Sequence, residues 1–399
     1  MTTAQSRPTT AAASKTDPLQ LIDVDHVRFY CGNAKQAAHF YAHTFGFNVS
    51  QISDLTTGSR DAAHYLLTQG NIRFVLTTGL AKDHPSSHHV ALYGDGVKDV
   101  AFNVFDAEKA WERAVKNGGQ PAYEPITLKD SRGSVTTAGI KTYGEVVHSF
   151  VSRTGEYGLP TVKQGGEFMP GYKKVEFGHN KYNAEHPCGL KFVDHLVGNV
   201  ELGGMNKGVK WYEDVLEFKM FKHFDDADIS TEYSALMSKV MASGNQLIKM
   251  PINEPAHGKK KSQVQEYLDF TEQVAGVQHL ALRTDDQLAS ITELRRRGVD
   301  FLDIPTAYYE QVWERVNATL KAHGHEAVKE DHKRVRDLGI LVDADDEGYL
   351  LQLFTKPLQD RPTLFFEIIC RRGSQSFGKG NFKALFQALE HEQERRGNL

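Results

Sequence analysis

Three polar side chains occupy predicted strand positions where the surrounding pattern favours apolar residues. His195 and His279 each have apolar residues two positions away on both sides, and Glu367 stands between Phe365 and Ile369. Because successive side chains of a strand point to opposite faces, each of the three is expected to share a face with apolar neighbours. A carboxylate in such a place needs a cation, because desolvation makes an unpaired charge costly there.

The residue types of this group predict a metal site. Two neutral imidazoles and one carboxylate are the ligands of facial-triad Fe(II) enzymes, which keep open positions for substrate and dioxygen. Zinc accepts the same set, so the residue types do not choose the metal. The alternatives are hydrogen-bonded core histidines and a structural ion pair of the acid. Gln352, also polar among apolar residues, is expected beside Glu367 if their two strands pair.

The elements that carry these residues belong to a tandem repeat of one strand–helix–strands unit, with two units in each half. The matching motifs are Val-Asp-His at 24–26 and 193–195, Gly-Asn at 32–33 and 198–199, GVKDVAFNV at 96–104 and GVQHLALRT at 276–284, and VVHSFVSR and FFEIICRR. In the first half, the positions of the candidate ligands hold His26, Asp99 and Ser149. Because Ser149 removes the charged ligand, we expect a metal-free copy there and one metal ion per chain.

The repeat and the local composition predict the domain organisation. Residues 1–18 are rich in Ser, Thr and Ala and predict a disordered tail. A non-catalytic domain is expected at 19–153 and a catalytic, metal-binding domain at 190–399. Residues 154–189 are rich in Gly, Pro and polar residues, which predicts a linker rather than core.

The C-terminal segment 381–396 predicts an amphipathic helix with Asn381 as a plausible N-cap. Its apolar stripe consists of Phe382, Leu385, Phe386 and Leu389. The glycines at 378 and 380 could act as hinges. We expect the helix to pack on the core and also to act as a lid that closes the metal site against water.

The bulk composition limits the classes of function. The 399 residues are 40% hydrophobic and 25% charged, as in an ordinary soluble protein of two or three domains. A formal net charge of -4 gives no basic footprint for nucleic acid or an anionic membrane, and no apolar run is long enough to span one. Three widely spaced cysteines, Cys31, Cys188 and Cys370, favour a reducing cytoplasm over a disulfide framework. We also expect a homo-oligomer, either a dimer or a tetramer.

Several stretches together carry a specific family resemblance, although none would be persuasive alone. They are TEYSALMSKV, PINEPAHGKKKSQ, GVQHLAL, DEGYLLQLFTKP, RPTLFFEII and FGKGNFKALF. Over nearly all of residues 20–399 the chain resembles the 4-hydroxyphenylpyruvate dioxygenase family of the vicinal oxygen chelate superfamily. The resemblance implies an α+β fold in which tandem βαβββ modules form two open barrel-like halves, with a C-terminal lid helix.

The resemblance also implies an activity and the residues that carry it. An enzyme of this kind uses one Fe(II) per chain to convert 4-hydroxyphenylpyruvate and dioxygen to homogentisate and carbon dioxide, in tyrosine catabolism. The implied metal ligands are His195, His279 and Glu367, and the implied catalytic residues are Gln278, Gln352 and Phe382. The polar groups around the substrate would be Ser234, Asn253, Gln263, Gln278 and Gln352, and its aromatic and closing wall Phe354, Phe365, Phe377, Asn381 and Phe382. Cys370 stands where the family commonly has a charged residue, and it is expected to face away from the metal.

Three other functions remain open at this point. 4-Hydroxymandelate synthase shares the fold, metal and substrate but oxidises the benzylic carbon; its pattern tends to lack the runs seen here at 251–256 and 378–382. An extradiol ring-cleaving dioxygenase would share the triad but would need a catechol and acid–base residues near the metal. A keto-acid or metal-binding sensor would bind its ligand without oxygen uptake.

Overall fold

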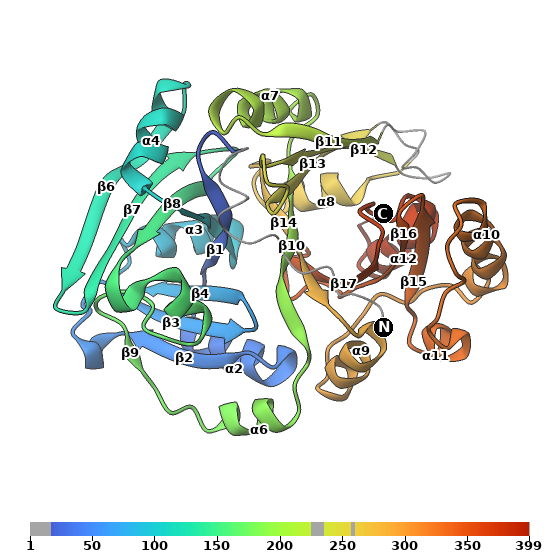
Figure 1. The fold of residues 1–399 in the computed structure, drawn as a ribbon, viewed down its shortest axis with the longest axis horizontal. Coiled ribbons are helices and arrows are strands. Elements are labelled where there is room, and N and C mark those ends of the chain that lie inside the picture. The colour runs from blue at the N-terminus through green and yellow to red at the C-terminus, as the bar shows by residue number, and fades with distance from the viewer. Residues whose placement is uncertain (1–16, 225–234, 257–259, 399) are drawn as a thin grey trace.

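The computed structural model describes residues 17–224, 235–256 and 260–398 of the chain. They form two mixed β-sheets with helices around them, the N-terminal half at the left of Figure 1 and the C-terminal half at the right. The predicted α+β class, with two curled halves, is confirmed.

The N-terminal sheet has the strand order β6-β7-β8-β5-β1-β4-β3-β2-β9. Its strands are β1 Leu21–Tyr30, β2 Asn48–Ser53, β3 Ala62–Gln69, β4 Ile72–Gly79, β5 Gly96–Val104, β6 Gln120–Asp130, β7 Gly133–Lys141, β8 Val147–Arg153 and β9 Lys173–Lys174. The helices are α2 Ala34–Phe45, α3 Pro85–Tyr93, α4 Ala107–Lys116, α5 Leu159–Lys163 and α6 His179–Glu185, with short 3-10 turns η1 Leu55–Thr57 and η2 Gly155–Tyr157.

The C-terminal sheet has the order β11-β12-β13-β10-β14-β17-β16-β15. Its strands are β10 Leu190–Asn199, β11 Lys219–Phe224, β12 Ala235–Ala242, β13 Lys249–Ala256, β14 Gly276–Thr284, β15 Leu341–Asp345, β16 Gly348–Phe354 and β17 Phe365–Arg372. The helices are α7 Met205–Val215, α8 Gln263–Asp269, α9 Gln287–Arg296, α10 Tyr308–Ala322, α11 His332–Asp337 and α12 Phe382–Arg395, which follows the 3-10 turn η3 Lys379–Asn381.

The two sheets repeat one topology. Read from β2 to β6, the N-terminal order matches the C-terminal order from β11 to β15 strand for strand, with β9 as an additional edge strand. The register repeats as well, because Arg28 pairs with Asp99 in the first sheet as Val197 pairs with His279 in the second. The sequence repeat is therefore a structural repeat.

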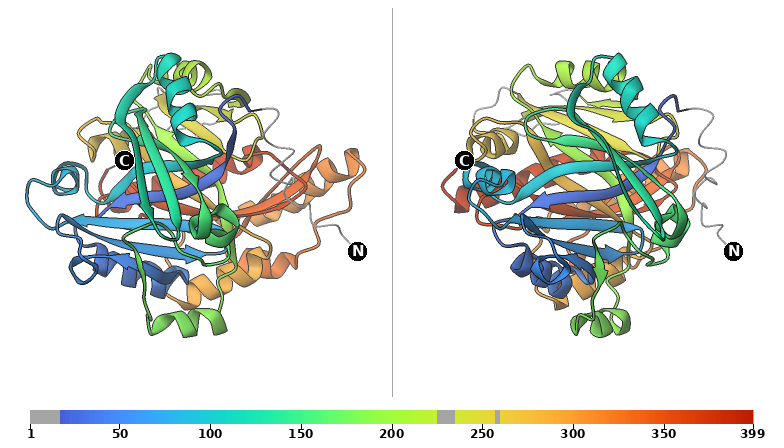
Figure 2. Two further views of the ribbon diagram at one scale, coloured as in Figure 1. Left: turned by 60° about the vertical axis from the view of Figure 1, so that its left-hand side comes forward. Right: turned by 90° about the vertical axis from the view of Figure 1, so that its left-hand side faces the viewer.

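The halves pack together through one shared core (Figure 2). The ring of Phe366 on β17 lies 5.9 Å from that of Tyr41, 5.1 Å from that of Phe45 and 5.7 Å from that of Phe74, measured between centroids. Since side chains alternate along a strand, Phe366 points into this core and the adjacent Glu367 points to the opposite face. Packing the halves together thus leaves the other face of each sheet free to form a cavity.

Residues 154–189 differ from the linker that their composition predicts. Tyr157 and Phe168 are fully buried and belong to a cluster on the N-terminal sheet that also contains Leu66 and Val75. The backbone N–H of Phe168 and the carbonyl of Gly166 hydrogen-bond to the side chain of Gln51. The segment connects the halves, but its large apolar residues also close one end of the N-terminal half.

The described residues include no helix with the length and apolar character needed to cross a membrane.

Candidate metal centre and substrate cavity

The three candidate ligands converge from three neighbouring strands of the C-terminal sheet. His195 lies on β10, His279 on β14 and Glu367 on β17, and one ligand atom from each lies within 4.8 Å of the other two. Oε2 of Glu367 is 3.1 Å from Nε2 of His195 and 3.7 Å from Nε2 of His279. All three residues are buried. A buried cluster of two imidazoles and one carboxylate has the ligand atoms to hold a metal ion.

The register explains how residues so distant in sequence meet. Ala281 on the central strand pairs with His195 on one side and with Glu367 on the other, so the three side chains share one face. Ala281 is fully buried, and its methyl group is the smallest side chain that an L-residue can place between the two ligands. A small residue here leaves room for an ion.

This register makes a testable prediction. Ala281→Leu is expected to lower the bound metal by more than about tenfold, because the leucine methyl groups would occupy the space between His195 and Glu367. Ala281→Ser, which is nearly the same size, is the matched control and should bind metal like the parent chain. Metal analysis beside thermal unfolding would measure both effects. Full metal occupancy in the folded leucine variant would contradict this account of the spacing.

A β-bulge on β10 breaks the alternation of side chains that the sequence predicted around His195. Pairing passes from Val193 with Leu282 to His195 with Ala281, so that Asp194 is an extra residue on β10. Val193 therefore packs in the shared core, whereas His195 faces the cavity. The sequence pattern was wrong in placing Val193 and His195 on one face.

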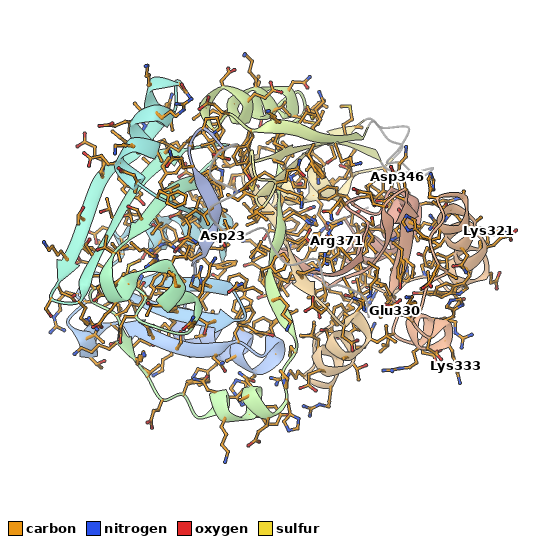
Figure 3. The ribbon with its side chains drawn as sticks, viewed as in Figure 1. Asp23, Lys321, Glu330, Lys333, Asp346 and Arg371 are labelled. Carbon is orange, nitrogen blue, oxygen red and sulfur yellow. The ribbon has the colours of Figure 1, made fainter. Side chains whose placement is uncertain are left out.

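The extra residue orients the histidine. Oδ1 of Asp194 lies 2.9 Å from Nδ1 of His195 and accepts a 2.7 Å hydrogen bond from Nη2 of Arg371. Burial alone would raise the pKa of Asp194, but the charge of Arg371 and the hydrogen bonds from both partners hold it well below its usual range. An ionised carboxylate can only accept, so Nδ1 carries the proton and Nε2 presents its lone pair to the site. Arg371 is buried, and Figure 3 shows it near the middle of the molecule, away from Lys321 and Lys333 at the edge of the C-terminal half.

An amide orients the second histidine. Nδ1 of His279 is 3.0 Å from Oε1 of Gln278, and Nε2 of Gln278 donates a 3.4 Å hydrogen bond to Oε1 of Gln263. Burial, together with the nearby His195, lowers the pKa of His279 well below its usual value, which favours the neutral form that binds metals. Gln278 thus holds His279 and Gln263 in one arrangement.

A cavity of about 80 Å³ adjoins the three ligands. It is lined by Asn253, Gln263, Gln278, Phe354, Phe365, Phe377 and Phe382, all of which the sequence selects, and by the stripe residues Leu385, Phe386 and Leu389 of α12. The ring of Phe365 stacks on that of His279, with centroids 4.7 Å apart. The arrangement offers apolar walls with a few neutral amides, as small-molecule sites do.

Three selected residues lie elsewhere. Gln352 is buried beside Gly378 in the loop before α12, and neither its Nε2 nor its Oε1 has a hydrogen-bond partner among the described residues. Asn381 precedes α12 but does not cap it with its side chain; its Oδ1 accepts from the hydroxyl of Tyr308 at 2.7 Å. Ser234 lies outside the described residues.

The sequence analysis did not select the cavity-lining residues on β10 and β12 or Pro251 on β13. Val197, Leu236, Ser238, Val240 and Pro251 also line the cavity. Ser238 on β12 pairs with Asn253 on β13, so the two polar side chains are neighbours. The alternation of Leu236, Ser238 and Val240 was a usable signal, because it places the three residues on one face of a strand.

Helix α12 closes the cavity. Phe386 packs with Leu236 and Val240, while Leu385 packs with Phe354 and Phe365. Cavities that hold a benzene ring have about 150 Å³, nearly twice the volume found here. The space left beside α12 in this structure is thus smaller than an aromatic ligand needs.

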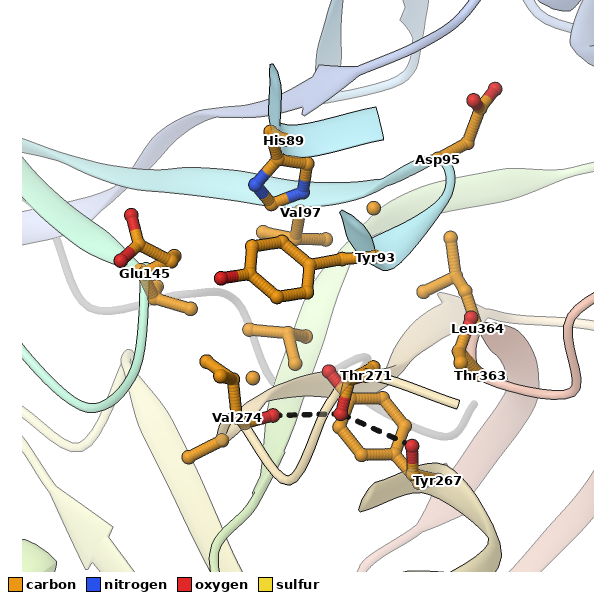
Figure 4. A pocket seen from close by; sticks show the side chains of 15 residues that line it. His89, Tyr93, Asp95, Val97, Glu145, Tyr267, Thr271, Val274, Thr363 and Leu364 are labelled. Atoms are coloured by element: carbon orange, nitrogen blue, oxygen red, sulfur yellow. Dashed lines mark hydrogen bonds between the residues drawn. The ribbon is translucent and has the colours of Figure 1, made fainter. Parts of the chain in front are cut away.

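A second cavity lies between the two halves. Figure 4 shows His89 and Tyr93 of the N-terminal half facing Tyr267 and Thr271 of the C-terminal half. Its volume is about 30 Å³, which is too small for an aromatic acid. This second cavity is therefore not a candidate for the substrate site.

Comparison with known proteins places these observations in a family context. The family model "Glyoxalase/Bleomycin resistance protein/Dioxygenase superfamily" matches residues 23–138 and 193–318. The chain is 46% identical over 381 residues to 4-hydroxyphenylpyruvate dioxygenase of Yarrowia lipolytica, with 94% of this chain and 93% of that one covered. It is 44% identical to the protein of that name in Danio rerio, with 98% and 95% covered. Among solved structures, a mutant of 4-hydroxymandelate synthase from Streptomyces coelicolor has a TM-score of 0.77 at 26% identity, with 93% and 98% covered.

Proposed function

This chain belongs to the 4-hydroxyphenylpyruvate dioxygenase family, and we propose that it converts 4-hydroxyphenylpyruvate and dioxygen to homogentisate and carbon dioxide at an Fe(II) centre, as a step of tyrosine catabolism. The observation that carries the proposal is the buried group of His195, His279 and Glu367 beside an apolar cavity. It occurs in a chain that is 46% identical to a relative of that name along nearly its whole length.

The residues present fit an iron ion. No lysine or arginine among the described residues lies within 4.0 Å of the carboxylate of Glu367. Its partners are the imidazoles of His195 and His279, so the three groups can share one bound cation. Asp194 and Gln278 accept at Nδ1 of His195 and His279, so both histidines would turn Nε2 to a bound metal. Iron held there supplies open positions for a 2-keto acid and dioxygen and the electrons that activate oxygen.

The remaining residues bind and orient the substrate. Phe354, Phe365 and Phe382 would hold the aromatic ring, and Asn253 and Gln263 would hydrogen-bond its phenol end without competing for the metal. Closure of α12 would keep bulk water from the reacting groups. We propose that Gln352, whose buried amide lies beside Gly378 and has no partner among the described residues, binds a polar group of the substrate.

The overall reaction balances with these components. The keto acid loses its carboxyl carbon as carbon dioxide, the former keto carbon becomes a carboxylate with one oxygen atom of dioxygen, and the other oxygen atom becomes a ring hydroxyl as the side chain migrates. Oxygen uptake with Fe(II) and the keto acid, followed by chromatography, tests this. One homogentisate per dioxygen is expected; binding without oxygen uptake would instead indicate a sensor.

4-Hydroxymandelate synthase is the alternative, because a solved structure of that name shares the fold. The ligands cannot discriminate between the two reactions; the position of the ring relative to the metal can. Asn253 and Phe382 both line the cavity. The synthase structure shares 26% identity with this chain, whereas the dioxygenases share 44–46%. We therefore favour ring hydroxylation.

Shrinking the lid-side wall should change the product. Phe382→Ile is expected to raise the share of 4-hydroxymandelate, because a shift of about 1 Å in substrate position can change a rate roughly a hundredfold. Phe382→Tyr keeps the ring and is the matched control. Chromatography of each reaction measures the ratio of the two products. An unchanged ratio in the isoleucine variant would show that Phe382 does not select the site of oxidation.

The assembly and compartment remain part of the proposal. A homo-oligomer, dimer or tetramer, can be tested by sedimentation. A reducing compartment such as the cytoplasm suits Cys31, Cys188 and Cys370, which are buried and form no disulfide.

A further inference from the structure

The N-terminal half contains a cavity of about 600 Å³, much larger than the cavity beside the metal ligands. Polar and aromatic residues from β1, β3, β4, β5 and β6 line it, among them Arg28, Tyr30, His64, Thr77, Asp99 and Tyr123. Ligand sites are usually a few hundred cubic ångströms or more and combine apolar walls with a few polar groups. In size and lining, this cavity resembles a site for a small molecule.

The structural repeat places this cavity at the same position in its half as the substrate cavity. Arg28 takes the place of Val197, because their cross-strand partners Asp99 and His279 are equivalent. His64 pairs with Thr77 as Ser238 pairs with Asn253. The two cavities thus use the same backbone framework with different side chains.

The main difference between the two cavities is Arg28, which stands where the other half has Val197. The guanidinium of Arg28 donates a 3.3 Å hydrogen bond to Oγ1 of Thr77 and also hydrogen-bonds to Tyr172. Asp99 attracts it electrostatically, but no described carboxylate lies within 4.0 Å of it. Its neighbour Asp99 is occupied by hydrogen bonds from the backbone N–H of Ser149 at 3.1 Å and from the Ser149 hydroxyl at 2.6 Å. Burial raises the pKa of Asp99, which weakens its charge as a partner further.

The other polar groups do not neutralise this charge. Burial, followed by the charge of Arg28, lowers the pKa of His64 to about 3, so that it is neutral. Lys98 and Lys141 also line the cavity; Lys98 pairs with Glu145 at 3.2 Å. A guanidinium that faces a cavity without a carboxylate partner is suited to a planar anion, which it can bind through two parallel hydrogen bonds.

We propose that the N-terminal half binds an aromatic monocarboxylate, with the carboxylate on Arg28 and the ring among Tyr30, Tyr123 and Ile126. Serine and aspartate stand in this half where Glu367 and His279 bind metal in the other, so charge pairing with arginine replaces metal chelation. The site does not depend on the catalytic activity, and it would add a second binding site to each chain.

Calorimetry with the full chain tests the proposal, with 4-hydroxyphenylacetate as the probe. This molecule has the ring and carboxylate but lacks a 2-keto group to chelate iron. Saturable binding is expected in the parent chain and in Glu367→Ala. Arg28→Gln should weaken binding at least about tenfold, since hydrogen bonds to charged groups are the strong ones. The uncharged analogue 4-hydroxyphenethyl alcohol should bind correspondingly weakly.

A second variant tests the same site without replacing the half-buried Arg28. Ile126 is 51% exposed at the cavity wall, so Ile126→Trp should fold and place an indole where the ring of the probe would lie, which weakens binding. Leu128→Trp, on the same strand at a position 42% exposed and outside the lining, is the matched control and should bind the probe normally. No saturable binding in the parent chain would overturn the proposal. Parent-level binding in Ile126→Trp, or equal binding of the alcohol, would overturn it too.

Discussion

Glu367→Ala is expected to remove bound iron and lower turnover by more than about a hundredfold, while the chain stays folded. Changes to residues that only contact a metal ligand already cost 10- to 100-fold, so loss of the ligand itself should cost more. Folding should persist, because alanine removes a buried charge that has no lysine or arginine partner among the described residues. His195→Ala and His279→Ala should behave alike. Metal analysis, oxygen uptake and circular dichroism measure the three quantities.

The structural repeat offers a matched control for this experiment. Ser149 occupies the position of Glu367 in the N-terminal half, where its hydroxyl donates to Asp99. Ser149→Ala should leave iron and turnover near those of the parent chain, and we expect one iron per chain. Parent-level iron in Glu367→Ala would remove this residue from the ligands. A stoichiometry near two would show that the N-terminal half also binds metal.

Deleting residues 377–399 should leave iron bound but lower homogentisate formation by more than about tenfold and speed inactivation. The deletion removes Phe377, Phe382 and the α12 side chains that wall the cavity, yet none of the three metal ligands. Water and reductant would then reach the metal during turnover. Product chromatography, iron content and activity over time give the result.

A shorter deletion separates the lid from the chain end. Ending the chain at Arg396 keeps α12 and the ion pair of Arg396 with Glu266, at 2.8 Å, and should retain activity. Circular dichroism of the longer deletion shows whether the apolar residues it uncovers disturb the fold. Parent-level activity of the folded longer deletion would reduce α12 to a packing element.

The sequence determined the candidate ligands and the repeat because both follow from local rules. Alternation along a strand placed Glu367 opposite Phe366, and the structure has one in the cavity and the other in the shared core. The paired motifs predicted that His26, Asp99 and Ser149 would occupy equivalent positions, and the strand registers confirm it. The side-chain period along β17 and the spacing of the motifs depend on the chain itself and not on its neighbours.

Local rules failed where a neighbouring strand or segment decides the outcome. The extra residue Asp194 changes which face Val193 occupies, and a bulge depends on the pairing partner. The composition of residues 154–189 is polar, yet Tyr157 and Phe168 are buried against apolar residues of the N-terminal sheet. Alternation within its strand placed Ser238 on one face with Leu236 and Val240, but only the register with Asn253 brought that face to the site.

The tertiary structure alone also decided how much space each half encloses. Helix α12 reduces the cavity beside the ligands to about 80 Å³, whereas the equivalent space in the N-terminal half keeps about 600 Å³ around Arg28. Strand sequences specify which side chains face a cavity, but its volume depends on what packs over the sheet. The metal site could therefore be read from residue types and spacing, and the second cavity could not.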